Sequence, residues 1–449
     1  MKVPVKLLAV FSLLISIPIF YFGWKKFLRT ELPSLPEQSA FANKQNNLLP
    51  GSYYEVSIPP VKNDQYLSAD YRIWIPDGMQ KVRGLIIKQH GCGDAAAATG
   101  LDHANDLQWQ ALAVKHQLAL VGTKLPTGDR PCESWALINY GSGGAFLKAL
   151  DALADKSQHS ELKTVPWVLW GHSGGADWVA QMLQQYPDRT IAVIAARGGG
   201  FTLLGTNPII AGIPVLFALG EKDKEAVVET QERPKQAFLR YRKINAPWAL
   251  ASEANTAHET GDTRLLAIPY FDALLTLRLP KNGKYLRPID RTQGWLGDIS
   301  TRKIAPTNEY QGYPQQAAWL PNEETARKWQ EYVTTGKISP TQKPTTPTDL
   351  RATRISANEV LLTWHFTINQ EIGLPSFRIY RDNSLIATLQ GQQHNFGDAA
   401  EPPNVVLEFR DKNSTNNAVY TVAAFNALGE SVSRSAELIS SISLPNYSH

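Results

Sequence analysis

The sequence predicts an α/β domain built on a mainly parallel sheet, followed by a small all-β sandwich. From residue 82 to residue 279, short apolar runs alternate with helix-like stretches, as in consecutive βαβ units. The apolar runs are nearly continuous, which is typical of strands buried on both faces of a sheet. Beyond residue 346 the segments are short and alternate apolar with polar residues, which indicates antiparallel strands. The chain of 449 residues is also longer than a single hydrophobic core usually supports, so two or three domains are expected.

The elements of the α/β region can be placed in order along the chain. Two alternating segments, 53–59 and 68–76, predict a half-exposed antiparallel pair at its start. Buried strands are expected at 82–90, 118–126, 166–173, 190–196, 214–220 and 247–254. Helices are expected at 101–117, 144–156, 175–186, 226–243 and 263–279, with a break at Pro234. Residues 281–337 lose this rhythm but keep three tryptophans, so we expect a C-terminal excursion that packs on the same domain, residues 51–337.

The first thirty residues differ from the rest of the chain. Lysines precede an apolar stretch at residues 7–24, which has roughly the length of a bilayer span, and further basic residues follow it. This pattern predicts a signal peptide or an uncleaved membrane anchor over residues 1–30, followed by a polar linker over residues 31–50. Both alternatives place the protein outside the cytoplasm, as a secreted, periplasmic or membrane-anchored protein.

Composition narrows the classes of partner. The formal net charge is only +4 and there is no dense tract of Lys and Arg, so nucleic acid is not an expected partner. No cluster of ligand-type residues has metal-site spacing, so neither a metal nor another cofactor is expected. The two cysteines, Cys92 and Cys132, form an even pair, which predicts one disulfide in an exported protein.

The segment LWGHSGGADW places Ser173 between glycines, after an apolar strand and before a helix. This is the G-x-S-x-G pattern of a nucleophile elbow, in which a sharp turn leaves no room for side chains beside the serine. The hydroxyl would project at the carboxyl edge of the sheet, where open α/β folds bind their ligands. A similar segment around Ser142 lacks the first glycine and follows no strand, so Ser142 is expected to begin a helix.

A nucleophilic serine needs a base and an acid that orients the base. His258 follows the strand at 247–254, and Asp223 follows the strand at 214–220. The order Ser, acid, His is that of serine hydrolases with a nucleophile elbow, and all three positions lie at one edge of the predicted sheet. We therefore expect Ser173 as nucleophile, His258 as general base and Asp223 as its orienting acid. Alternative acids are Glu221, Glu225 and Asp262.

Acyl transfer also needs donors for the developing oxyanion. One is expected from the N–H of Gly174, the residue after the nucleophile, and the other from the loop after the strand at 82–90. In that loop we favour the N–H of Cys92, with Gly91 as the alternative. The loop that carries Cys132 follows the next strand, so a disulfide between Cys92 and Cys132 would pin the oxyanion loop.

Trp135 comes shortly after Cys132 and is predicted to form a wall of the substrate site. The other tryptophans are expected to be packing residues for the most part.

The segments HGCG, CESW, GHSGG and AHET occur in this order and resemble the polyhydroxybutyrate depolymerase and feruloyl esterase group of α/β-hydrolases, over roughly residues 53–280. GHSGG and the late histidine are shared by many hydrolases, whereas HGCG with a later Cys close to a Trp is more specific. The resemblance implies an α/β-hydrolase fold and a secreted serine esterase. It also implies nucleophile Ser173, acid Asp223, base His258 and an oxyanion contact at Cys92.

The C-terminal part, residues 347–444, resembles a fibronectin type III module. Trp364 lies in an early predicted strand, Tyr380 lies in FRIYRD, and Tyr420 occupies the place of a tyrosine-corner residue. The preceding residues, 338–346, are rich in Pro and Thr and are expected to form a semi-rigid linker.

These observations predict an exported serine esterase that hydrolyses carboxylic esters through an acyl-enzyme, with polyester or polysaccharide-linked esters among its substrates. One alternative is a peptidase or amidase on the same fold. The other is a non-catalytic binding or adhesion protein. The retention of Ser173, Asp223 and His258 together argues against the second alternative, because binding alone requires none of them.

Overall fold

The computed structural model describes residues 49–199, 206–281, 285–368, 370–371, 373, 375–391 and 407–439. The predicted signal peptide or anchor over residues 1–30 lies outside the described residues, as does most of the polar linker that follows it. In the part that is described, no helix is both long enough and apolar enough to cross a bilayer.

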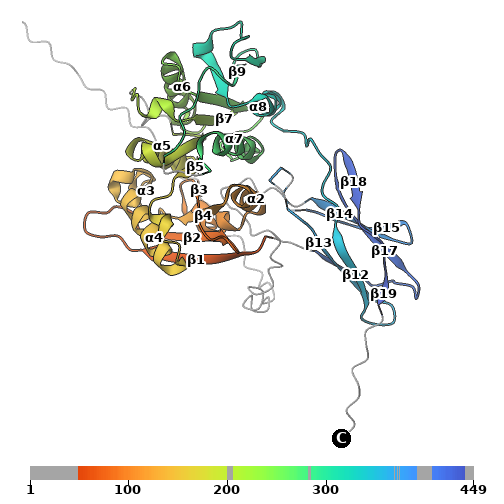
Figure 1. The fold of residues 1–449 in the computed structure, drawn as a ribbon. Helices are drawn as coiled ribbons and strands as arrows, with labels where there is room; N and C mark the ends of the chain where they lie inside the picture. Colours follow the sequence, from red (N-terminus) through yellow and green to blue (C-terminus); the bar gives the residue numbers. More distant parts are fainter. Residues whose placement is uncertain are drawn as a thin grey trace, which may run out of the picture. The chain divides into compact units, whose positions relative to one another are not determined.

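One mixed sheet of eight strands, in the order β1-β2-β4-β3-β5-β6-β7-β8, forms the centre of the α/β domain (Figure 1). The strands are β1 Gly51–Ile58, β2 Ala69–Pro76, β3 Gly84–Gln89, β4 Leu118–Lys124, β5 Trp167–His172, β6 Thr190–Ala196, β7 Val215–Gly220 and β8 Trp248–Glu253. β1 and β2 form the predicted antiparallel pair, β2 is antiparallel to β4, and the remaining pairs are parallel. Every residue of β5, β6 and β7 is buried, as their continuous apolar runs predicted.

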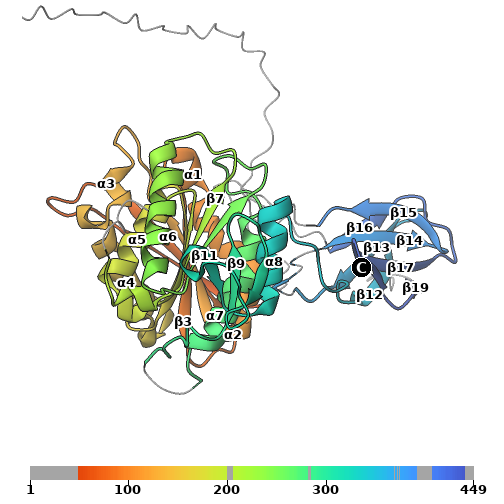
Figure 2. The same ribbon diagram turned by 90° about the horizontal axis from the view of Figure 1, so that it is seen from above.

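Helices cover both faces of this sheet, as the view from above shows (Figure 2). They are α1 Asp94–Ala98, α2 Leu107–His116, α3 Glu133–Ala136, α4 Ser142–Ser157, α5 Gly174–Gln185, α6 Arg233–Lys243, α7 Thr263–Arg278 and α8 Glu323–Thr335. α4, α5 and α6 pack on one face, where Phe146 and Trp178 meet edge to face with ring centroids 5.4 Å apart. α2, α7 and α8 pack on the other face, where Trp109 contacts Phe271. The predicted α/β class is therefore confirmed.

The helix expected at 226–243 differs in detail. Residues Val228–Glu232 form a π-helical turn, and α6 begins at Arg233 with Pro234 in its first turn. Proline has no N–H to donate, and the regular hydrogen-bond pattern of the helix is interrupted where the π-helical turn meets Pro234.

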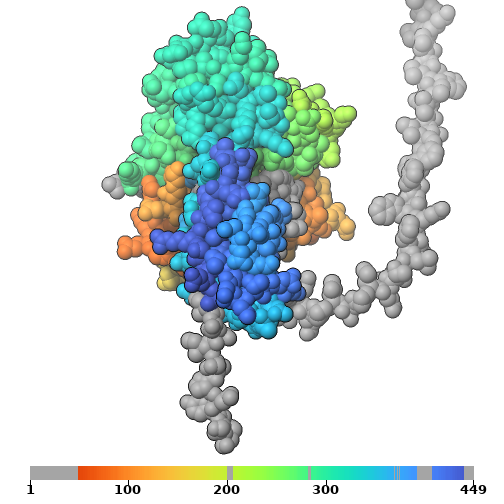
Figure 3. Space-filling model, turned by 90° about the vertical axis from the view of Figure 1, so that its right-hand side faces the viewer, coloured from red at the N-terminus to blue at the C-terminus, as the bar shows by residue number. Residues whose placement is uncertain are grey.

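The excursion after residue 281 has a structure that its irregular sequence did not reveal. A three-stranded sheet in the order β10-β9-β11 is formed by β9 Trp295–Asp298, β10 Ile304–Pro306 and β11 Ala317–Leu320, and it is followed by α8. Trp329 of α8 is buried, and its Nε1 donates a hydrogen bond to the carbonyl oxygen of Leu250 in β8 at 2.9 Å. The excursion therefore packs on the α/β domain, as expected, and its teal atoms form part of the surface in Figure 3.

The described C-terminal residues are all strand and turn. β12 Thr348–Arg354, β13 Val360–His365, β14 Ser376–Arg381, β15 Ser384–Leu389, β16 Glu408–Asp411, β17 Val419–Asn426, β18 Gly429–Val432 and β19 Ala436–Ile439 are linked by antiparallel pairs and one parallel pair. Trp364 and Tyr420 are buried in its core, and the Tyr420 hydroxyl donates to Asp411 Oδ2 at 2.7 Å. The all-β class of this part is as predicted, and the resemblance to a fibronectin type III module stays a prediction.

Candidate active site

Ser173 lies on the sharp turn between β5 and α5. Its φ of 53° and ψ of −121° form a conformation that non-glycine residues rarely adopt, and its N–H donates to the carbonyl oxygen of Ala196 at 2.8 Å. A Cβ at Gly171 would lie 2.1 Å from the carbonyl oxygen of Gly175, and one at Gly175 would lie 2.4 Å from that of His90. The glycines of the motif are therefore required by close approach of the backbone, as the sequence pattern predicted.

The structure brings together Ser173, His258 and Asp223, the three residues of the predicted catalytic relay. Ser173 Oγ lies 2.9 Å from His258 Nε2, and His258 Nδ1 lies 2.9 Å from Asp223 Oδ2. The Asp223 side chain is fully buried, whereas 20% of the His258 side chain is exposed. An ionised carboxylate can only accept, so Nδ1 carries the imidazole proton and Nε2 accepts the serine proton. This is the geometry that lets a serine hydroxyl act as a nucleophile.

The three alternative acids form no hydrogen bond to His258 in the described part of the chain. Glu221 Oε2 instead accepts from the N–H of Asn255, and the N–H of Glu225 donates to Asp223 Oδ1 at 3.0 Å. The third, Asp262, precedes α7. Asp223 is thus the acid in contact with the imidazole.

The loop that carries His258 is held closely against its neighbours. His172, the residue before Ser173, is buried, and its Nε2 donates to the carbonyl oxygen of His258 at 2.7 Å. A Cβ at Gly220 would lie 2.0 Å from the carbonyl oxygen of Ala257. The sequence shows only that His172 precedes Ser173 in the turn, because no local pattern shows which distant backbone group a side chain will meet.

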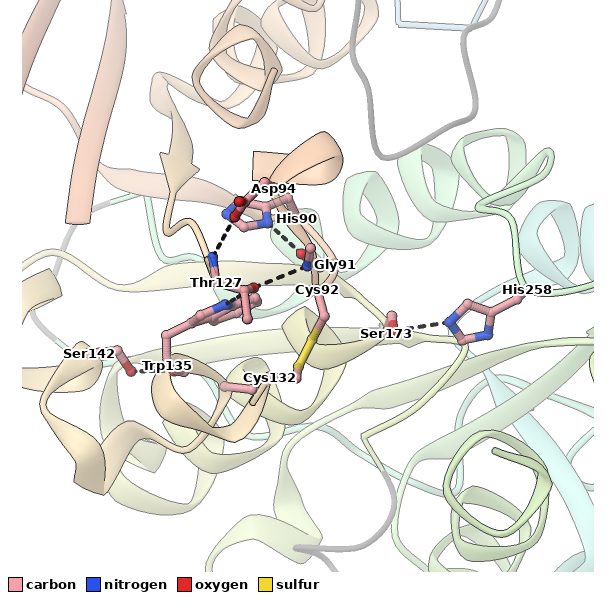
Figure 4. The surroundings of a disulfide bond; sticks show 12 residues. His90, Gly91, Cys92, Asp94, Thr127, Cys132, Trp135, Ser142, Ser173 and His258 are labelled. Atoms are coloured by element: carbon pink, nitrogen blue, oxygen red, sulfur yellow. Dashed lines mark hydrogen bonds between the residues drawn. A yellow bond between two sulfur atoms is a disulfide. The ribbon is translucent and has the colours of Figure 1, made fainter. Parts of the chain in front are cut away.

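The structure contains the predicted disulfide between Cys92 and Cys132, whose Cα atoms are 5.5 Å apart. The bridge joins the loops that follow β3 and β4, which are hydrogen-bonded neighbours in the sheet. Figure 4 shows the disulfide beside Ser173. A Cβ at Gly174 would lie 2.1 Å from Cys92 Sγ, so the disulfide packs directly on the residue that follows Ser173.

His90 orients the peptide group before Cys92. Its Nε2 accepts from the N–H of Leu125 at 2.9 Å, so its Nδ1 carries the proton and donates to the carbonyl oxygen of Gly91 at 2.6 Å. A trans peptide points its N–H opposite to its carbonyl, so the Cys92 N–H points away from His90. Within the described residues no acceptor takes the N–H of Cys92 or of Gly174, and both remain available as oxyanion donors.

The predicted role of Trp135 as a substrate wall is wrong. Its side chain is fully buried, its Nε1 donates to Thr127 Oγ1 at 3.3 Å, and its ring packs on His90 with centroids 5.0 Å apart (Figure 4). Thr127 Oγ1 in turn accepts from the N–H of Gly93 at 3.1 Å. Trp135 therefore supports the Cys92 loop from within the core, where a substrate has no access to it.

Asp177, one turn along α5 from Ser173, is a second acid near the site that the sequence gave no reason to select. Burial raises the pKa of this carboxyl to about 7, although the N–H of Gly199 donates to its Oδ1 at 3.0 Å and favours the charged form. The neighbouring Gly198 lies beside Ser173, because a Cβ there would be 3.0 Å from the Ser173 carbonyl oxygen. Asp177 thus fixes the backbone next to Ser173.

Among the residues that the structure describes, no group of His, Cys, Asp and Glu has a metal-binding arrangement.

No protein-family model matches the chain, and no curated protein matches it. Among solved structures it is similar to a ferulic acid esterase, with 12% identity, 51% of this chain and 97% of that chain covered, and a TM-score of 0.34. An S-formylglutathione hydrolase from Agrobacterium tumefaciens matches at 12% identity over 52% of this chain and 97% of that chain, with a TM-score of 0.37. A cold-adapted esterase from an Arctic intertidal metagenomic library matches at 14% identity over 49% and 93%, with a TM-score of 0.34. These likenesses are distant, and the site is defined by its own geometry.

Proposed function

We propose that this protein is a serine hydrolase that cleaves carboxylic esters through an acyl-enzyme. The observation that carries the proposal is the pair of 2.9 Å contacts that join Ser173 Oγ to His258 and His258 to buried Asp223. The strained conformation of Ser173 adds support, since such strain persists where the surrounding structure enforces it and is frequent at active sites.

The chemistry follows from these contacts. Ser173 Oγ attacks the ester carbonyl carbon while its proton passes to His258 Nε2, and Asp223 stabilises the resulting imidazolium. The oxyanion of the tetrahedral intermediate accepts hydrogen bonds from the N–H groups of Gly174 and Cys92. The carbon–oxygen bond to the leaving alcohol breaks, and the alcohol takes the proton from Nε2. Water then repeats the attack with His258 as base, which releases the acid and restores Ser173.

Location and substrate class extend the proposal. A disulfide persists mainly in oxidising compartments, so the Cys92–Cys132 bond supports an extracytoplasmic protein. The resemblance of its motifs to polyester depolymerases and feruloyl esterases makes polyesters and polysaccharide-linked esters the first natural substrates to assay.

The test is hydrolysis of short-chain nitrophenyl esters by the purified protein, with Ser173→Ala and with Ser356→Ala as a matched control at an exposed serine. Loss of a triad serine can cost roughly a millionfold in turnover, so Ser173→Ala should fall to background. A fluorophosphonate probe should add covalently to Ser173, which peptide mass spectrometry locates. Nitroanilide substrates run in parallel separate an esterase from an amidase. The proposal would be refuted if the parent protein neither hydrolysed the esters nor reacted with the probe.

A further inference from the structure

We propose that Arg197, Glu253 and Tyr332 form a buried chain of positioning residues that connects α8 of the C-terminal excursion to the catalytic base His258. The inference rests on the proposed function and goes beyond it, because it gives the 281–337 excursion a part in catalysis.

The chain of contacts is short and continuous. The Tyr332 hydroxyl donates to Glu253 Oε2 at 2.6 Å, and Arg197 Nη2 pairs with the same oxygen at 2.6 Å. Arg197 Nε donates to the carbonyl oxygen of Glu259, the residue after His258, at 3.0 Å. Arg197 and Tyr332 are 0% exposed and Glu253 is 2% exposed, so water does not compete for these contacts.

Glu253 also holds the far end of the loop that carries the base. Its Oε1 accepts from the N–H of Asp262 at 2.6 Å, and a Cβ at Gly261 would lie 2.4 Å from the same oxygen. The carboxylate thus fixes the backbone at residue 262, and through Arg197 it fixes the carbonyl of residue 259. In the segment between β8 and α7, the backbone that follows His258 is therefore held by hydrogen bonds at residues 259 and 262.

Arg197 further links the base to the nucleophile. It follows Ala196, whose carbonyl oxygen accepts the N–H of Ser173 at 2.8 Å. The φ of Arg197 is 55°, a left-handed value that is uncommon for a residue with a side chain. Its Nη1 donates to the carbonyl oxygen of Ala218 at 3.0 Å, which fixes the guanidinium on β7. Arg197 is thus bonded directly to the residue whose carbonyl oxygen accepts the Ser173 N–H, and its side chain contacts the residue after His258.

A purely structural role would not require this chemistry. Burying a charged pair costs desolvation, and apolar side chains of similar volume often give equal or greater stability. A rigid ionic link has a different effect, because it fixes distances, and small misplacements of a catalytic group can cost up to a hundredfold in rate. Burial raises the pKa of Tyr332 well above its ordinary value, which keeps the hydroxyl a neutral donor at the end of the chain.

The test compares Tyr332→Phe with Tyr310→Phe. Tyr310 belongs to the same excursion and donates to a carboxylate, Asp298 Oδ2, at 3.0 Å, but among the described residues its hydroxyl forms no hydrogen bond to Glu253 or Arg197. Both variants lose one tyrosine–carboxylate hydrogen bond, so both should lose some stability. Turnover is measured per active site, counted by fluorophosphonate titration, at a temperature where all proteins are folded.

We expect Tyr332→Phe to lower kcat about tenfold with KM within about twofold of the parent, and Tyr310→Phe to keep the parent kcat. Arg197→Lys, which keeps the charge and loses the forked geometry, should lower kcat at least as much. If kcat per titrated site is unchanged in Tyr332→Phe, or falls equally in Tyr310→Phe, the positioning role is overturned while the proposed function stands. If Ser173→Ala remains active, the proposed function fails and this inference fails with it.

Discussion

Removal of the Cys92–Cys132 disulfide should weaken both folding and catalysis. The cysteines are 40 positions apart, and closing a loop of this length stabilises the folded state by about 4 kcal/mol in the chain-entropy treatment. Cys132→Ala leaves the predicted oxyanion donor, the N–H of Cys92, in the chain while it breaks the bond that pins it. Loss of an oxyanion donor costs roughly a hundredfold or more in kcat, so a donor that is only loosened should cost about tenfold.

Two measurements separate these effects. Urea unfolding of the parent and of Cys132→Ala, followed by tryptophan fluorescence, gives the change in the free energy of unfolding. Ester hydrolysis well below the unfolding midpoint gives kcat for the folded enzyme. A fall in the free energy of unfolding with an unchanged kcat would refute the reasoning that the disulfide positions the Cys92 N–H. An unchanged free energy of unfolding would refute the estimate from loop closure.

Two further predictions follow from the site and its surroundings. Gly174→Ala should destabilise the protein by about 1–3 kcal/mol in thermal unfolding because a Cβ there meets Cys92 Sγ at 2.1 Å, whereas Gly144→Ala, where a Cβ meets nothing within 4 Å, should be neutral or stabilising. Burial lowers the pKa of Lys88 to about 8 in the folded protein, so between about pH 8 and its unfolded value the unfolded chain binds more protons and the contribution of Lys88 to stability rises with pH. Lys88→Met should remove this rise, so the free energy of unfolding in urea should increase with pH more steeply in the parent than in the variant, by roughly 1 kcal/mol per pH unit between about pH 8 and the unfolded pKa of lysine. Parallel pH dependences of the two proteins would contradict the lowered pKa.

The residues of the relay were accessible to sequence reasoning because their signals are local. Ser173 lies in a motif with its own strand and helix, and Asp223 and His258 each lie within a few residues of the end of an apolar strand. Parallel strands have their carboxyl ends at the same edge of the sheet, so three residues that each follow such a strand were expected at that edge.

Other features depend on contacts that no local pattern encodes. Glu253 meets Tyr332 across 79 positions and Arg197 across 56, and neither pair belongs to a recognisable motif. Strands of three or four residues, such as β9 and β10, are too short to show a period of two. The position of Trp135 three residues after Cys132 gave no information on the direction of its ring, and the ring points into the core.

The contact between Gly174 and the disulfide has a consequence for how this chain can vary. The sulfur of Cys92 occupies the volume that a methyl group at position 174 would need. Glycine at 174 and the two cysteines therefore form one unit of covariation. A mutant library that retains both cysteines should return glycine almost alone at 174, whereas a background without them has room for alanine there. A redesign that places a side chain at position 174 must accordingly replace the two cysteines as well.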